Sequence, residues 1–125
     1  MQEMMHLSFN LLAVVTAGIF LLIAIVWLFA PDHFLAAWNI KDYAETRLIG
    51  RRLSVLYAGV SIMFFAARHA EQSTIRTALI YGLVSTCLIL AVLGCYELLK
   101  GRAGKGILAA VLIEVLLSIL FMLII

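Results

Sequence analysis

Four long apolar stretches alternate with three short polar connections along the chain. The stretches cover residues 7–30, 51–68, 77–99 and 106–125. A helix that crosses the hydrocarbon core of a bilayer needs about 20 mostly apolar residues. The pattern therefore predicts an all-α polytopic membrane protein. We expect an antiparallel bundle of four transmembrane helices that forms a single transmembrane domain over residues 1–125.

The connection after the first stretch has a pattern of its own. Pro31 ends the first helix, because proline has no N–H with which to continue it. Beyond it, Phe34 and Trp38 stand four residues apart, on one side of a short predicted helix. Aromatic rings favour the headgroup level of a bilayer. We therefore expect a short interfacial segment that forms an aromatic belt with Trp27 and Tyr43, or, alternatively, a surface on which a partner docks.

Composition and charge agree with a membrane protein and argue against a nucleic-acid-binding one. Hydrophobic residues make up 66% of the chain, charged residues only 13%, and the net charge is +2. Soluble domains carry about twice that share of charged residues. Nucleic-acid binding requires a continuous basic surface, whereas the basic residues here are scattered among the connections. The lipid bilayer is therefore the expected environment, with no nucleic-acid partner.

The distribution of lysine and arginine predicts the orientation. Arg68 and Arg76 flank the second connection, and the other seven of the nine basic residues lie in or beside the first and third connections. These seven are Lys41, Arg47, Arg51, Arg52, Lys100, Arg102 and Lys105. Cytoplasmic loops carry an excess of basic residues. Connections one and three are therefore predicted to face the cytoplasm, and both termini the outside.

Ionisable residues in and beside the spans are the candidates for a specific function. Glu114 lies about 12 Å into the fourth helix when it is counted from Gly106, at about 1.5 Å per residue. A charge at that depth is costly and usually faces the bundle interior. Glu97 lies near the same end of the third helix, and Arg51 and Arg52 begin the second. We predict an intramembrane ionic cluster of these four residues that fixes helix register; a ligand or headgroup site and proton-coupled transport are the alternatives.

Small and polar residues in the spans predict where helices touch, since they allow close approach in lipid. Ser54 and Ser61 share one face of the second helix, and Ser118 follows Glu114 by one turn. Asn10 offers a similar contact in the first helix.

Two further small-residue pairs predict association between chains. Ala13 and Ala17 lie one turn apart in the first helix, and Gly106 and Ala110 do so in the fourth. Both pairs would let another helix approach closely. We therefore expect a homo-oligomer or a complex with other membrane subunits.

No motif in the chain indicates catalysis or a cofactor. The third connection is rich in glycine, but it lacks the spacing of a phosphate-binding loop, so its glycines are expected to cap and turn helices. Cys87 and Cys95 are about 12 Å apart along one helix, beyond disulfide reach. The three histidines lie at helix ends rather than facing one another, as a haem would require. We predict no enzymatic activity, no metal site and no cofactor.

Several short segments carry a resemblance to a known family. Trp27-Leu28-Phe29-Ala30-Pro31 closes the first helix, Gly50-Arg51-Arg52-Leu53 opens the second, and Glu114 lies in the last. In this order the chain resembles the small four-helix bacterial inner-membrane proteins of the DoxX-like kind, many of which have no known function. The resemblance implies a compact multi-pass bundle in the bacterial cytoplasmic membrane.

Some DoxX-like proteins are linked to quinone or thiosulfate oxidation, but no residue here carries that chemistry. The expected function is therefore that of an accessory, assembly or scaffold subunit of a membrane complex. A small proton-coupled transporter and a lipid- or quinone-associated membrane protein are the alternatives.

Overall fold

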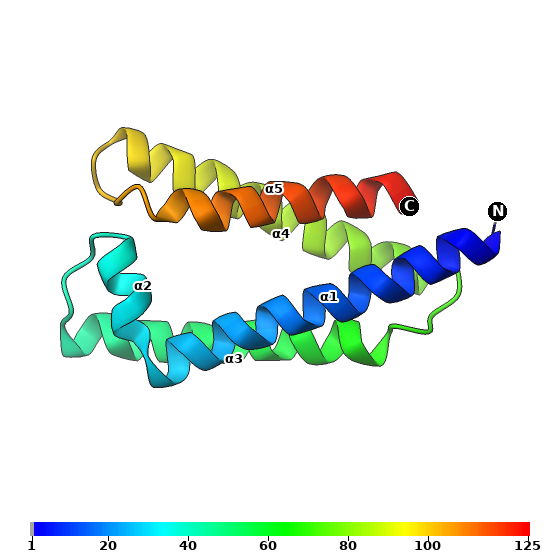
Figure 1. Cartoon of the computed structure of the whole chain (residues 1–125), viewed down its shortest axis with the longest axis horizontal. Helices are drawn as coiled ribbons and strands as arrows, with labels where there is room; N and C mark the ends of the chain where they lie inside the picture. The colour runs from blue at the N-terminus through cyan, green and yellow to red at the C-terminus, as the bar shows by residue number, and fades with distance from the viewer. Residues whose placement is uncertain (1) are drawn as a thin grey trace.

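The chain folds into four long helices and one short one (Figure 1). The computed structural model describes residues 2–125, with side chains from residue 8 onward. Over these residues the elements are α1 (Gln2–Phe29), α2 (Pro31–Ala37), α3 (Ala44–Ala66), α4 (Thr74–Leu99) and α5 (Ile107–Ile124), with no strand. The four long helices are apolar and long enough to cross a membrane. The predicted all-α membrane bundle with a short segment after its first helix is confirmed.

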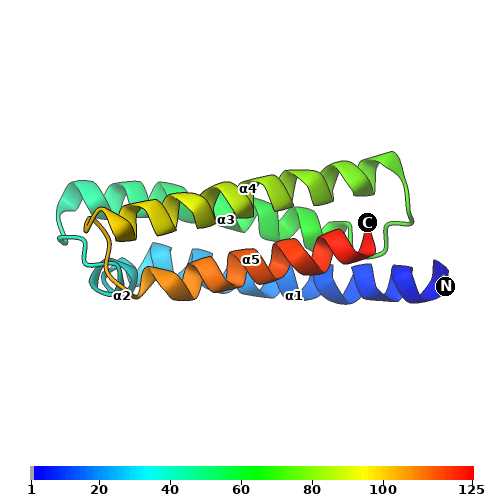
Figure 2. The same ribbon diagram turned by 90° about the horizontal axis from the view of Figure 1, so that it is seen from above.

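The long helices are arranged as two pairs. α1 packs along α3 and α4 packs along α5, while contacts between the pairs are fewer and run mainly between α1 and α5. Seen from above, the α4–α5 pair lies over the α1–α3 pair, with α5 over α1 and α4 over α3 (Figure 2). The pairs diverge toward the end that carries α2 and the α4–α5 connection, here called the α2 end (Figure 1). At that end α3 and α4 have very few close contacts with each other.

The best-packed part of the core lies where α1, α3 and α5 meet. The ring of Phe121 contacts Phe9 with a centroid separation of 6.3 Å and Phe64 with one of 5.6 Å, both edge to face. All three side chains are almost fully buried. Edge-to-face aromatic pairs add stability beyond the area that they bury. This trio therefore joins the two helix pairs.

Hydrogen bonds from two predicted contact residues link α1 to α3 and the chain just beyond it. The hydroxyl of Ser61 donates to the carbonyl oxygen of Ala17 at 2.6 Å. The side-chain amide of Asn10 donates to the carbonyl oxygen of Arg68 at 2.9 Å. Both bonds give buried or half-buried polar groups a partner, which a lipid environment cannot supply.

The other two predicted contact residues bond within their own helices. The hydroxyl of Ser54 donates to the carbonyl oxygen of Arg51, and that of Ser118 to the carbonyl oxygen of Glu114 at 2.8 Å. Both serines are buried. Their small side chains therefore sit inside the bundle without requiring a polar partner on another helix.

The α1 small-residue pair and Gly106 of the α5 pair have close contacts within a single chain. Ala13 and Ala17 are buried in the core of this bundle. A Cβ atom added at Gly106 would overlap the carbonyl oxygen of Ala37. The expectation that the α1 pair offers a surface to another chain is wrong, because the core of its own bundle already covers that surface. The oligomeric state itself stays a prediction.

α3 begins seven residues before the predicted start at residue 51. The hydroxyl of Thr46 accepts a hydrogen bond from the backbone N–H of Tyr43 at 2.9 Å, which caps the helix there. Arg47 pairs with Asp42, with Nη2 and Oδ2 2.7 Å apart, and this hydrogen-bonded partner lowers the pKa of Asp42. The polar residues 45–47 interrupt the apolar run, so hydropathy alone placed the boundary too late.

Close backbone contacts hold α2 against the α4–α5 connection. Gly101 ends α4 with a φ of 75°, a conformation that glycine adopts without strain. The N–H of Gly104 donates to the carbonyl oxygen of Trp38 at 2.8 Å. Gly106 approaches Ala37 so closely that no side chain would fit between them. Gly101 follows the end of α4 and Gly106 is the N-cap of α5, as the predicted capping and turning role requires, while Gly104 and Gly106 also let α2 approach closely.

Substituting Gly106 by alanine should therefore destabilise the protein. The added methyl group would overlap backbone atoms of Ala37, which cannot move aside as a side chain can, and overpacking of this kind costs about 1–3 kcal/mol. Gly59→Ala is the matched control, because nothing lies within 4 Å of a Cβ atom there. The free energy of unfolding of both variants is measured in mixed detergent micelles. Equal values would contradict the contact between α2 and the α4–α5 connection.

The α3–α4 and α4–α5 connections lie at opposite ends of the bundle (Figure 1). From the basic residues we predict that the α4–α5 connection faces the cytoplasm. Glu71 and Lys105 are exposed in these two connections and can be changed to cysteine after Cys87 and Cys95 have been replaced by alanine. In intact cells a membrane-impermeant maleimide should label position 71 and not position 105. Labelling of position 105 but not of position 71 would show that the protein has the opposite orientation.

Candidate functional site

A cleft lies between the two helix pairs toward the α2 end. Its volume is about 340 Å³, and its walls come mainly from α3, α4 and α5. The wall side chains are predominantly apolar, among them Val60 and Leu90. Gly94 and Ala110 also line the cleft. Their small side chains, together with the divergence of the helices, leave this space unfilled. The exposed side chains of Leu56 and Leu93 belong to the lining, so the cleft opens between α3 and α4, where lipid would surround a membrane-embedded bundle.

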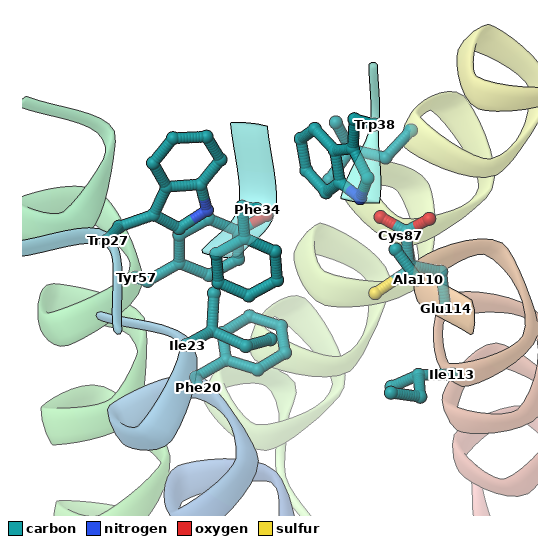
Figure 3. A pocket seen from close by; sticks show the side chains of 11 residues that line it. Phe20, Ile23, Trp27, Phe34, Trp38, Tyr57, Cys87, Ala110, Ile113 and Glu114 are labelled. Atoms are coloured by element: carbon teal, nitrogen blue, oxygen red, sulfur yellow. The ribbon is translucent and has the colours of Figure 1, made fainter. Parts of the chain in front are cut away.

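The inner end of the cleft is an aromatic recess with a volume of about 40 Å³. It shares Tyr57, Ala110 and Glu114, among other residues, with the larger cleft, so the two spaces adjoin. Aromatic rings from α1, α2, the residue that follows α2, and α3 line it (Figure 3). These rings belong to Phe20, Trp27, Phe34, Trp38 and Tyr57.

Trp27 is the centre of the ring contacts in the recess. It stacks on Phe34 with a centroid separation of 5.0 Å and an interplanar angle of 14°, and it meets Trp38 edge-on at 5.5 Å. On its other side it packs on Gly50 of α3, where a Cβ atom would overlap the ring. The glycine therefore positions the indole against α3.

The predicted aromatic belt is wrong for Trp27, which lies inside the bundle, and stays a prediction for the half-buried Phe34 and Trp38. Trp27 is only 3% exposed, whereas Tyr43 remains exposed. Pro31 and Leu35 are buried where α2 turns back over the end of the bundle. With α2 held there, the ring of Phe34 stacks on Trp27.

Glu114 supplies the carboxyl group of the site. Its side chain is half-buried and lines both the recess and the larger cleft. Figure 3 shows this carboxyl group on the side of the recess where the indole of Trp38 lies. Among the described residues, Glu114 has neither an ion pair nor a side-chain hydrogen bond. Its carboxyl group is therefore available to a bound molecule.

The structure corrects the predicted ionic cluster. Glu97 pairs with Arg102, five residues further along the chain, with Nε and Oε2 2.6 Å apart. Arg51 and Arg52 are exposed on α3, and neither pairs with a carboxylate among the described residues. α3 and α4 diverge at this end, so the two arginines do not reach Glu97 or Glu114.

A second polar group in the recess lacks a partner. The indole Nε1 of Trp27 is buried and has no hydrogen-bond partner among the described residues. Leaving a buried donor unsatisfied costs about 1–3 kcal/mol, and such groups are rare in native structures. The recess therefore combines an N–H that lacks an acceptor with a carboxyl group that lacks a counterion.

The sequence interpretation missed this aromatic recess. A signal for it was present, because Phe20 and Trp27 are seven residues apart and so share one face of α1. That face also carries buried small residues, including Ala24. What the pattern did not reveal is that α2 would add two more rings to the same face.

Comparisons of the chain with protein-family models, curated proteins and solved structures found no match. The DoxX-like resemblance therefore stays a prediction, and the function of the site is argued from its own geometry.

Proposed function

We propose that this membrane protein binds a lipid-soluble molecule with a polar head in the cleft between its helix pairs, without catalysing a reaction on it. The observation that carries the proposal is the unpaired carboxyl group of Glu114 in an otherwise apolar cleft. An isolated ionisable group within a membrane is costly and marks a functional site by default. A bound polar head offsets that cost.

The size and opening of the cleft support the same proposal. Small-molecule sites have volumes of about 300–1,000 Å³ and are mostly apolar with a few polar groups, and this cleft has a volume of about 340 Å³. A molecule dissolved in the bilayer would enter between α3 and α4 past Leu56 and Leu93. Its apolar part would contact the cleft walls and its polar head would reach the aromatic recess.

An accessory or assembly subunit of a larger membrane complex is the second candidate. The observation that favours it is the same open edge, where α3 and α4 expose apolar side chains without contacting each other closely. A helix of another subunit would close this edge. Proton-coupled transport is less well supported, because it requires access from both sides of the membrane and this cleft opens sideways.

The proposal is tested by identifying and quantifying the molecules that co-purify with the protein. The protein is extracted in a mild detergent, and the molecules bound to it are compared by mass spectrometry with the bulk lipid of the same membranes. We expect one amphipathic molecule to be enriched to near-equimolar amount with the protein. The proposal would be overturned in favour of the second candidate by two observations together. The bound molecules would match the bulk lipid in composition, and a stoichiometric membrane subunit would cover α3 and α4.

A further inference from the structure

We infer that the molecule held in this cleft is a lipophilic cation whose positive centre lies between the carboxyl group of Glu114 and the rings of the aromatic recess. This inference rests on the proposed function and specifies the charge of the ligand. Its apolar substituents would occupy the larger cleft between α3 and α4.

The charges around the cleft favour a cation. Glu97 and Glu114 line the larger cleft, and among the described residues no lysine, arginine or histidine lines either space. Arg102 balances Glu97 through two hydrogen bonds, which leaves Glu114 as the carboxyl group without a counterion. It lies about 11 Å into α5 when counted from Ile107. A cationic ligand compensates this charge, whereas an anionic ligand would add a second uncompensated one.

The aromatic rings favour an organic cation over a metal ion. Ring faces attract a cation within about 6 Å, tryptophan most strongly, and Trp38 lines both spaces on the side where the Glu114 carboxyl group lies (Figure 3). Hard metal ions require about six oxygen ligands. The recess offers only the Glu114 carboxyl group and the Tyr57 hydroxyl among its side-chain oxygens. An alkylated or arylated ammonium or phosphonium ion therefore fits these surroundings best.

Two probe ions of the same shape and opposite charge test the inference. Tetraphenylphosphonium and tetraphenylborate differ mainly in charge, and triphenylmethanol is a neutral relative. The two tryptophans of the chain both line the recess, so their fluorescence in lipid nanodiscs reports binding there, after correction for probe uptake by protein-free nanodiscs. We expect saturable binding of the phosphonium and binding of the borate at least about tenfold weaker, which is about 1.4 kcal/mol.

Substitutions test whether Glu114 causes the expected preference for a cation. Glu114→Gln should weaken phosphonium binding at least about tenfold, and Glu114→Asp, which keeps the charge, should retain most of it. Glu45→Gln is the matched control and should change affinity less than about twofold, because Glu45 is exposed and lines neither space. Thermal unfolding of each variant in the same nanodiscs shows that the fold is intact.

The outcomes distinguish the inference from the function on which it rests. If the borate or the neutral probe binds as tightly as the phosphonium, or if Glu114→Gln binds like the unaltered protein, the cation inference is overturned while ligand binding stands. If no probe of any charge binds saturably, the proposed function itself fails. Preferential phosphonium binding that is lost in Glu114→Gln and kept in Glu45→Gln supports both.

Discussion

Replacing Phe121 by alanine is expected to destabilise the bundle by about 2–4 kcal/mol, the largest loss of stability that we expect from one substitution. Its ring contacts Phe9 of α1 and Phe64 of α3, where the two helix pairs are joined. Buried Phe→Ala changes in water-soluble proteins cost about 3–5 kcal/mol. We expect somewhat less here, because lipid solvates exposed apolar groups and only the packing contribution is lost.

Phe29→Ala provides the control for this substitution. Phe29 is 77% exposed at the end of α1, so its truncation removes little packing within the bundle. Unfolding by sodium dodecyl sulfate in mixed micelles compares the two variants. A loss at Phe121 no larger than the loss at Phe29 would show that the aromatic trio does not hold the two pairs together.

Replacing Ala110 by phenylalanine is expected to abolish ligand binding while the bundle stays folded. Ala110 lines both the cleft and the recess, so the larger ring would occupy the space that a ligand needs. We expect phosphonium affinity to fall at least about thirtyfold, about 2 kcal/mol. The measurement is the tryptophan fluorescence titration in nanodiscs.

Ala109→Phe is the matched control for the blocked cleft. Ala109 precedes Ala110 on α5 but is exposed and absent from the linings of both spaces. The same substitution there should leave affinity within about twofold, since the added ring would point into lipid. Equal losses at positions 109 and 110, or no loss at either, would place the binding site elsewhere.

The architecture was predictable because the bilayer imposes a strong constraint. Every backbone polar group in hydrocarbon must be satisfied internally, so a long apolar run becomes a helix. The helix ends were less predictable where polar caps extend a helix beyond its apolar run, as Tyr43 and Thr46 do for α3. The position of α2 could not be predicted from the sequence for a different reason. Aromatic residues spaced four apart suit either a headgroup layer or a buried recess, and only contacts between distant segments decide which forms.

The site was harder to predict because depth in the membrane does not determine which helices face each other. Glu97, Glu114 and the arginines of α3 all lie toward the α2 end, yet Glu97 pairs with a residue of the adjoining connection. Arg76 shows the same limit at the opposite end. In the sequence, Arg76 was identified only as a basic residue that flanks a connection. In the structure it is 2% exposed, and its guanidinium lies 4.2 Å from the ring centroid of Phe9.

Photo-crosslinking locates the ligand most directly. A lipophilic ammonium that carries a diazirine would be activated in nanodiscs with and without excess tetraphenylphosphonium, and its adducts mapped by peptide mass spectrometry. We predict adducts on cleft residues such as Leu90 and Ala110 that the competitor suppresses. Adducts confined to exposed outer residues such as Ile89 and Val92, and unaffected by the competitor, would contradict a binding site in the cleft.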